Sequence, residues 1–317
     1  MIKKIMAMAK KIVKNHKSSL LVKIFLLIVA LLFIGYFGVS LYIANDLTKS
    51  TPNPTDDSPT FVASHVTNST FLATDGIILH GWYFKNTQSN ANNRIIIFVS
   101  GIGQNKANDD YYALFIAHNL YQDGYSILLY DPREIEPQVT RNDFGQTRGN
   151  DVLGAVQFTK QEGYAPKNIG IIADSLGTAA VLMVVEKLNT VGPIVIDSGI
   201  ARMQPVAEHL MASEHGIPSF LYPGILFLTK IIYHVDIANI NPVDHVKNVP
   251  NRAFLFLVGT NDNVVPVENS TELLKAANPA SKLVVFPGAM HVNTYRSNPT
   301  LYLNSVNAFF NQQFPNQ

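Results

Sequence analysis

Residues 169–177 read Ile-Gly-Ile-Ile-Ala-Asp-Ser-Leu-Gly, and this stretch decides the fold. The apolar run up to Ala173 is typical of a strand buried on both faces, and the residues from Leu176 onward are typical of a helix. So sharp a turn forces Ser175 into a strained backbone conformation with its hydroxyl projecting, and small residues at 173 and 177 let strand and helix pack closely. The helix N-terminus also favours negative charge that develops nearby. The pattern is short, however, and by itself it equally fits a serine that only caps the helix.

Two further residues favour a catalytic role for Ser175 over a capping role. Asp262 follows the apolar run 254–258, and His291 follows the run 283–286. Each alone has an ordinary interpretation, as a turn aspartate or an exposed loop histidine. The order Ser, then Asp 87 residues later, then His 29 residues later, each after a separate strand, is the order of the α/β-hydrolases. We therefore predict Ser175 as nucleophile, Asp262 as the acid that orients the base, and His291 as the base.

The rest of the body alternates between strand-like and helix-like stretches from residue 70 onward. A hairpin is expected where residues 71–74 and 77–84 flank Asp75-Gly76. Further strands are expected at 94–99, 125–130, 168–173, 193–196, 253–258 and 282–286. Helices are expected at 109–121, 151–161, 176–188, 267–276 and 299–310, with a partly helical insert at about 200–250. This succession predicts an α/β fold with a mostly parallel sheet covered by helices on both faces. Reactive groups on such a sheet gather at the carboxyl ends of the strands.

With these motifs in place, the sequence resembles the α/β-hydrolase superfamily, and within it the membrane-anchored Bem46-like or serine-aminopeptidase-like hydrolases. The resemblance covers about residues 70–312. Besides the Asp262 and His291 motifs, three stretches carry it: residues 75–83 (DGIILHGWY), residues 124–131 (GYSILLYD) and Asn241-Pro242-Val243-Asp244.

The resemblance implies an oxyanion hole made by two backbone N–H groups, those of Leu176 and Ile102. The supporting glycines would be Gly101 and Gly103 beside Ile102, and Gly177 beside the nucleophile. Three residues depart from the family pattern. Ala173 replaces the first glycine of Gly-x-Ser-x-Gly, Ser100 stands where histidine is usual, and Glu134 stands where glycine is usual.

The chemistry expected from these residues is cleavage of an ester, thioester or amide through an acyl-enzyme. No metal or organic cofactor is required, and the sequence has no metal-ligand cluster or phosphate-binding glycine loop. The partners expected are a small-molecule or lipid-like acyl substrate and the membrane. Two alternatives remain open: a serine peptidase or aminopeptidase, with Asp174 or Glu134 near the site, and a non-catalytic α/β-hydrolase scaffold that binds at the membrane.

The N-terminus predicts a membrane anchor. Residues 24–45 contain no charged residue, and 22 helical residues span about 33 Å, roughly the thickness of a bilayer core. The first 23 residues hold seven lysines and no acid, so the positive-inside rule places residues 1–23 in the cytoplasm and the catalytic domain on the extracytoplasmic side. The apolar run also has two other interpretations, a cleaved signal peptide and a buried core helix. Residues 1–19 fit either an amphipathic helix on anionic lipid or a solvated basic tail.

Composition sets the remaining limits. Residues 46–60 are rich in Pro, Ser, Thr and Asp, which is typical of a linker, so the hydrolase domain is expected at 61–317. Beyond residue 23 the chain has 17 basic and 23 acidic residues, and this acidic body argues against nucleic acid as a partner. The absence of cysteine excludes disulfides and a thiol nucleophile. The apolar stretch 217–232 inside the insert fits a lid over an acyl pocket, a second membrane contact, or an ordinary helix packed on the sheet.

Overall fold

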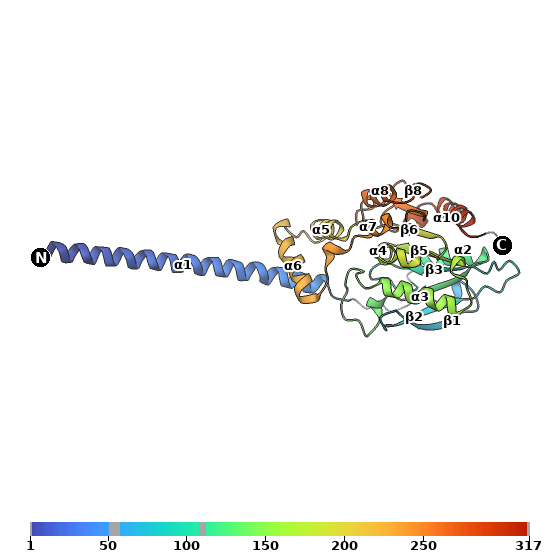
Figure 1. Ribbon diagram of the computed structural model, residues 1–317, viewed down its shortest axis with the longest axis horizontal. Helices are drawn as coiled ribbons and strands as arrows, with labels where there is room; N and C mark the ends of the chain where they lie inside the picture. The colour runs from blue at the N-terminus through green and yellow to red at the C-terminus, as the bar shows by residue number, and fades with distance from the viewer. Residues whose placement is uncertain (1, 51–57, 108–111, 316–317) are drawn as a thin grey trace.

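The body is built on one mixed sheet. The computed structural model describes residues 2–50, 58–107 and 112–315. In these residues eight strands lie in the order β1-β2-β4-β3-β5-β6-β7-β8 (Figure 1). Their bounds are β1 Thr67–Leu72, β2 Ile78–Phe84, β3 Ile95–Val99, β4 Ser126–Tyr130, β5 Ile169–Asp174, β6 Ile194–Asp197, β7 Phe254–Gly259 and β8 Lys282–Phe286. Strand β2 pairs antiparallel with β1 and with β4, and all other pairs are parallel.

Helices cover both faces of this sheet because the central strands are apolar on both sides. In β3 the side chains of residues 95, 97 and 99 enter one core and those of 96 and 98 the other, as the period of two requires. The first core is closed by α3 Gly149–Gln161, α4 Leu176–Leu182, α7 Pro242–Lys247 and α8 Val267–Ala276. The second is closed by α2 Ala113–Gln122 and α10 Pro299–Gln313, with the short α9 Thr294–Ser297 before it. The predicted α/β-hydrolase fold is confirmed.

Several boundaries differ from the expectation. The helix expected at 176–188 ends at Leu182, because the backbone of Val184 leaves the helical region at φ −121° and ψ 14°, and a 3-10 turn follows at Val185–Leu188. The first residues of the helix expected at 109–121 lie outside the described residues. So does part of the linker expected at 46–60, namely residues 51–57.

The N-terminal helix α1 Ile2–Leu47 is a single rod that projects from one end of the body (Figure 1). Its stretch Leu20–Leu47 is apolar and long enough to cross a membrane. The most apolar part of this stretch has no residue buried in the body, unlike a core helix, whereas Ser40 and Ala44 near its C-terminal end are buried. The rod continues past the predicted end at residue 45. Lys49 then pairs with Arg141 in a β-bridge, and the N–H of Asn142 donates to the carbonyl of Thr48, so residues 48–50 are tied to the body.

The insert forms a cap of two helices at the end of the body that α1 meets (Figure 1). They are α5 Met203–Ser213 and α6 Tyr222–Tyr233. In the apolar cluster that contains Ile225 and Leu228 of α6, the partners are Ala44 of α1 and Met211 of α5. The interpretation of residues 217–232 as an ordinary helix packed on the sheet is therefore wrong, because α6 buries its apolar face against α1 and α5.

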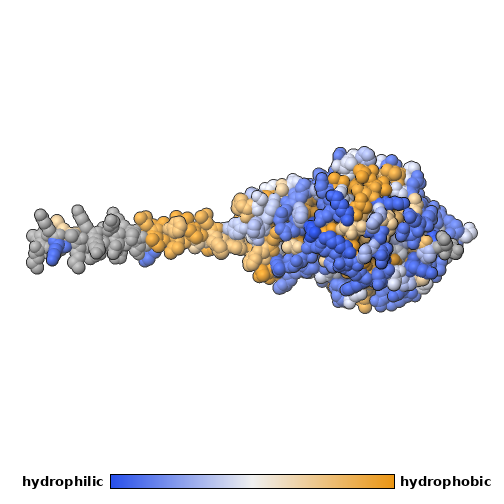
Figure 2. Space-filling view, turned by 45° about the horizontal axis from the view of Figure 1, so that its top comes forward, coloured by the Kyte–Doolittle hydropathy of each residue, from blue (hydrophilic) through white to orange (hydrophobic). Residues whose placement is uncertain are grey.

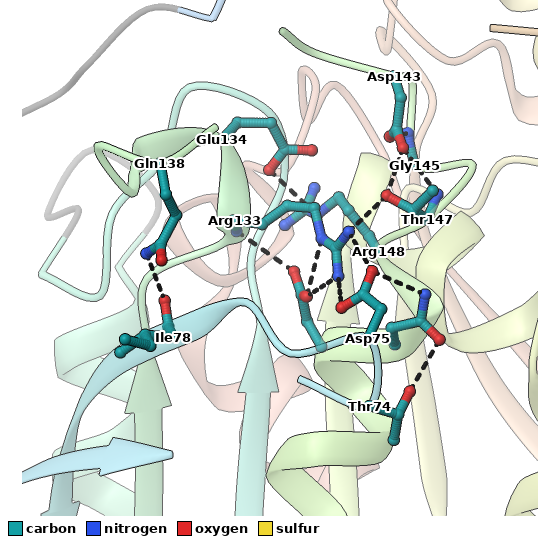
Figure 3. A network of polar contacts seen from close by, with 12 residues as sticks. Thr74, Asp75, Ile78, Arg133, Glu134, Gln138, Asp143, Gly145, Thr147 and Arg148 are labelled. Carbon is teal, nitrogen blue, oxygen red and sulfur yellow. Dashed lines mark hydrogen bonds and ion pairs between the residues drawn. The ribbon is translucent and has the colours of Figure 1, made fainter. Parts of the chain in front are cut away.

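A network of ion pairs centred on the buried Arg133 links the turn of the β1–β2 hairpin to the turn after β4 and to α3 (Figure 3). Arg133, in a 3-10 turn after β4, donates to both oxygens of Asp75 in the hairpin turn at 2.8 and 2.9 Å. It also donates to Asp151 of α3 at 2.6 and 2.9 Å. The side chain of Asp151 is only 1% exposed, so its charge depends on this partner.

We expect Arg133→Met to lower the free energy of unfolding by about 3–5 kcal/mol, because it leaves the Asp151 carboxylate buried without a cation. The matched control is Arg202→Met. Arg202 pairs with Asp244 and Glu272, but all three side chains are at least 36% exposed, so its loss should cost less than about 1 kcal/mol. Urea unfolding of the full chain in detergent, followed by the fluorescence of the single tryptophan Trp82, measures both. Equal losses in the two variants would contradict the role of the network.

Candidate active site

Ser175 occupies the turn between β5 and α4. Its backbone has φ 46° and ψ −124°, a conformation that L-residues rarely adopt and that is held only where the surroundings determine it. The serine N–H donates to the carbonyl of Asp197 in β6 at 3.0 Å. The hydroxyl makes no capping hydrogen bond to the described first turn of α4, so the interpretation of Ser175 as a simple N-cap is wrong.

Close packing of strand and helix imposes this turn. A Cβ on Gly177 would lie 2.0 Å from the carbonyl oxygen of Val99, so only glycine fits there. Ala173 is fully buried, and a small side chain is what that position accepts. The alanine in place of the family's glycine therefore leaves the turn intact.

The three residues predicted from their order along the chain lie together. His291 Nε2 is 2.8 Å from Ser175 Oγ. On the other side of the ring, His291 Nδ1 lies 3.0 and 2.9 Å from the two carboxylate oxygens of Asp262. Asp262 is itself fixed, because its Oδ1 accepts the backbone N–H groups of Val264 and Val265 at 3.1 and 2.8 Å. An aspartate so held can orient the imidazole and stabilise a positive charge on it.

The loop that presents His291 is also strained. Val292 has φ 50°, which is unusual for a β-branched residue. Its N–H donates to the hydroxyl of Ser198 at 3.1 Å, and the hydroxyl of Thr294 donates to the carboxylate of Asp197. Asp197 ends β6 and Ser198 follows it, so the strand between β5 and β7 holds the histidine loop in place.

The predicted oxyanion loop lies against the nucleophile. A Cβ on Gly101 would be 2.9 Å from Ser175 Cβ, so the backbone of this loop passes directly beside the serine. Gly103 has φ 69°, a left-handed conformation that suits glycine. Between them Ile102 is half-exposed, and Leu176 is the first residue of α4, where backbone N–H groups have no partner within the helix.

The departure at Glu134 is explained by Arg148. The guanidinium of Arg148 donates to the carbonyl of Ser100 at 2.6 Å. It also lies 3.5 Å from the carboxylate of Glu134 (Figure 3). Arg148 is 1% exposed and Glu134 is 6% exposed. Both side chains are therefore buried, and Arg148 holds the carbonyl of Ser100, which begins the predicted oxyanion loop.

Three carboxyl groups converge here from neighbouring strand ends: Asp174 at the end of β5, Asp197 at the end of β6 and Asp262 three residues after β7. Burial raises the pKa of Asp174 to about 6. Burial raises the pKa of Asp197 further, to about 8, and the nearby charges of Asp174 and Asp262 add to the effect. At neutral pH the Asp197 carboxyl is thus largely protonated, which lets a third acid sit beside the other two.

Sequence reasoning missed two of the supporting residues. Asp197 directly follows an apolar strand, which is the same signal that singled out Asp262, so it was detectable. Arg148 carries no local signal, because nothing in its neighbourhood in the sequence indicates that it points inward at the carbonyl of residue 100.

The strand order, the turn at Ser175 and the helices on both faces place the protein in the α/β-hydrolase superfamily. Within that class, the family model described as the prolyl oligopeptidase family matches residues 137–317. This is more than half of the chain, so the chain belongs to the prolyl oligopeptidase family, and the protein is a hydrolase of the serine type. The finer resemblance to Bem46-like hydrolases stays a prediction.

The chain is also similar to three other proteins. The uncharacterized protein YfhR of Salmonella typhi is 23% identical over 239 residues, which cover 71% of this chain and 74% of that protein. A solved esterase of Pyrococcus furiosus has a TM-score of 0.69 at 19% identity, over 85% of this chain and 99% of the esterase. A puromycin-hydrolyzing peptidase of Mycobacterium tuberculosis has a TM-score of 0.59 at 18% identity, over 80% of this chain and 40% of the peptidase. At such identities the two structures share the fold.

The raised pKa of Asp197 makes a prediction about stability. Since the folded state keeps its proton up to about pH 8 and the unfolded state loses it near pH 4, folding binds a proton in this interval. The contribution to stability is therefore full below about pH 4 and declines as the pH rises toward 8. We expect Asp197→Asn, which never ionises, to gain in melting temperature relative to the natural chain as the pH rises from 5 to 8. A difference that stays constant over this range would contradict the assignment.

Proposed function

We propose that the protein is a membrane-anchored serine hydrolase in which Ser175 is the nucleophile, His291 the general base and Asp262 the orienting acid. The substrate bond is a carboxylic ester in the first place, with thioester or amide as the related possibilities. The observation that carries the proposal is the continuous chain of short contacts from Ser175 Oγ through His291 to Asp262, at 2.8 and 2.9 Å.

The proposed reaction has two halves. In the first, Ser175 Oγ attacks the carbonyl carbon while its proton moves to His291 Nε2, and the N–H groups of Ile102 and Leu176 hold the oxyanion. The bond to the leaving group breaks, and the leaving group takes the proton from His291. In the second half, a water molecule gives its proton to His291 and attacks the acyl-enzyme, which releases the acid and returns the proton to Ser175.

An amide substrate is the second candidate, because the family is described by its oligopeptidases. An aminopeptidase needs a carboxylate that faces the substrate amine. Glu134 does not fill that role, since it is buried and faces Arg148. Asp174, the other carboxylate considered for this role, lies next to Ser175 and Gly101 and stays a candidate. We take the ester as the first choice, and a panel of p-nitrophenyl esters and aminoacyl anilides separates the two.

The test of the nucleophile is labelling of the full chain with a fluorophosphonate probe. We expect the natural chain to label and Ser175→Ala not to label. Asp262→Asn should lower ester turnover by up to about 10⁴-fold, since the wrong imidazole tautomer then faces the serine. Ser89→Ala, on an exposed loop, serves as the matched serine control and should label like the natural chain. If folded natural protein stays unlabelled, the hydrolase proposal fails and a binding scaffold takes its place.

We also propose that α1 anchors the protein, with residues 1–23 in the cytoplasm and the hydrolase domain on the other side. The support is the stretch Leu20–Leu47, together with seven lysines that all precede Ile24. Outside a bilayer, the exposed apolar side chains of this stretch would face water, and insertion into the bilayer buries them in lipid.

The chain lacks cysteine, so its topology can be tested with single introduced thiols. We expect Ser89→Cys to react with a membrane-impermeant maleimide in intact cells. Ser18→Cys, in the basic segment, should react only after the cells are opened. Reaction of both in intact cells, or the reverse pattern, would contradict the proposed orientation.

A further inference from the structure

Helix α6 and the second half of α1 are built to fit each other. The hydroxyl of Tyr36 accepts the N–H of Gly224 at 3.0 Å and donates to the carbonyl of Phe220 at 3.1 Å. A Cβ on Gly224 would lie 2.6 Å from Ser40 Oγ and 2.7 Å from the ring of Tyr36, so the two helices approach too closely for any other residue. The contact is thus a specific one.

This contact fixes how deep the cap sits. The charge-free part of α1 begins at Ile24, and its contacts with α6 begin at Tyr36, which is about 18 Å along the helix axis. The hydrocarbon core of a bilayer is about 30 Å thick. A membrane-spanning α1 must therefore immerse part of the stretch that α6 covers, which brings α6 to the depth of the lipid interface.

The outward face of the cap suits that depth. Four large apolar side chains of the α6 region are strongly exposed: Phe220 by 67%, Phe227 by 54%, Ile231 by 55% and Ile232 by 45%. In Figure 2 the hydrophobic surface of the rod continues onto the end of the body that it meets. An apolar helix face at the interface is buried among headgroups and acyl chains.

Two apolar hollows lie on either side of this contact. One is a groove lined by seven residues of α1 between Val29 and Val39, together with Phe220 and Leu221. On the inner side, a cavity of about 180 Å³ lies beneath α6. Its lining is Leu47 of α1, Ile102 of the oxyanion loop, Asn142, Phe144, four residues of the α5 segment (Ala207, Leu210, Met211 and His215), and Ile225, Leu226 and Ile237.

The cavity therefore has the catalytic loop at one wall and the anchor helix at another. Ile102, whose N–H is assigned to the oxyanion hole, contributes its side chain to the lining, and Leu47 is the last residue of α1. Most of the remaining lining is aliphatic or aromatic. Such a space accepts methylene groups. It reaches from the loop of Ile102 to the end of α1 at Leu47, and the backbone of Gly101, next to Ile102, passes beside Ser175.

We infer that the substrate is an acylated lipid drawn from the bilayer, whose acyl chain occupies the cavity beneath α6 and places its carbonyl at Ser175. This inference rests on the proposed hydrolase function and names its substrate class. The leaving group is the alcohol end of the lipid, and the product that remains after hydrolysis is a fatty acid.

The first test measures kcat/KM of the full chain in phosphatidylcholine vesicles for p-nitrophenyl acetate and p-nitrophenyl octanoate. Each buried methylene contributes about fourfold in binding, so burial of only two of the six additional methylenes should already make octanoate exceed acetate by about tenfold or more. Ala207→Trp fills the cavity and should reduce this ratio by about tenfold. Ala212→Trp lies on the exposed side of the same helix and should keep the natural ratio.

Because Ala207→Trp could perturb folding, Leu210→Trp provides a second, half-buried position on the same wall. Fluorophosphonate labelling of each variant shows whether the serine is still competent. If the variants label but keep the octanoate preference, or if the natural chain prefers acetate, the acyl-chain inference is overturned while the hydrolase function stands. If the natural chain neither labels nor cleaves any ester, the hydrolase function itself fails.

The second test asks where the substrate comes from. 4-Methylumbelliferyl palmitate is embedded either in the vesicles that carry the protein or in separate vesicles without it. Uptake from the bilayer predicts hydrolysis only in the first arrangement, with Ser175→Ala as the blank. Equal rates in both arrangements would overturn the bilayer as the source.

Discussion

The reversal of the chain at Ser175 is the constraint on which the site depends. The strand β5 and the helix α4 approach so closely that residue 177 has no room for a side chain beside the carbonyl of Val99. The serine in between is driven to positive φ, where its hydroxyl points away from the helix that follows. Backbone strain of this kind costs of order 1–3 kcal/mol, and the packed core on both sides of the sheet supplies the stability that offsets it.

The same close packing limits how many ionised carboxyl groups can lie buried around the site. Aspartates end three neighbouring strands, and each buried charge would raise the cost of the next. Asp262 keeps its position through two backbone N–H groups and the imidazole of His291. Asp197 avoids the problem by holding its proton, since its pKa is raised to about 8. Arg148 is the cation of this region, and it links Glu134 to the carbonyl of Ser100.

Much of this site could be predicted from the sequence because parallel sheets bring the ends of separate strands together. Ser175, Asp262 and His291 each follow an apolar run, so their meeting required only the order of strands and no knowledge of side-chain angles. Arg148 could not be found in this way, because its role depends on a contact across 48 residues with a backbone carbonyl. The packing partner of α6 could not be predicted from the sequence either. An apolar helix reads the same whether it covers a sheet or another helix, and only the close approach at Gly224 decides between them.

The proposed anchor α1 packs closely against α6, so it also fixes the position of the domain. An anchor joined by a free linker would only keep the domain near the bilayer. Here Asn45 at the end of α1 accepts hydrogen bonds from Tyr233 of the cap and from Arg141 of the body, so the rod is fixed to the domain at two places. In the proposed membrane arrangement, a fixed rod would define one orientation of the cavity relative to the lipid. Because the wall of the cavity includes Leu47, α1 is a part of the candidate binding site, and a domain cut free of α1 would lose that wall.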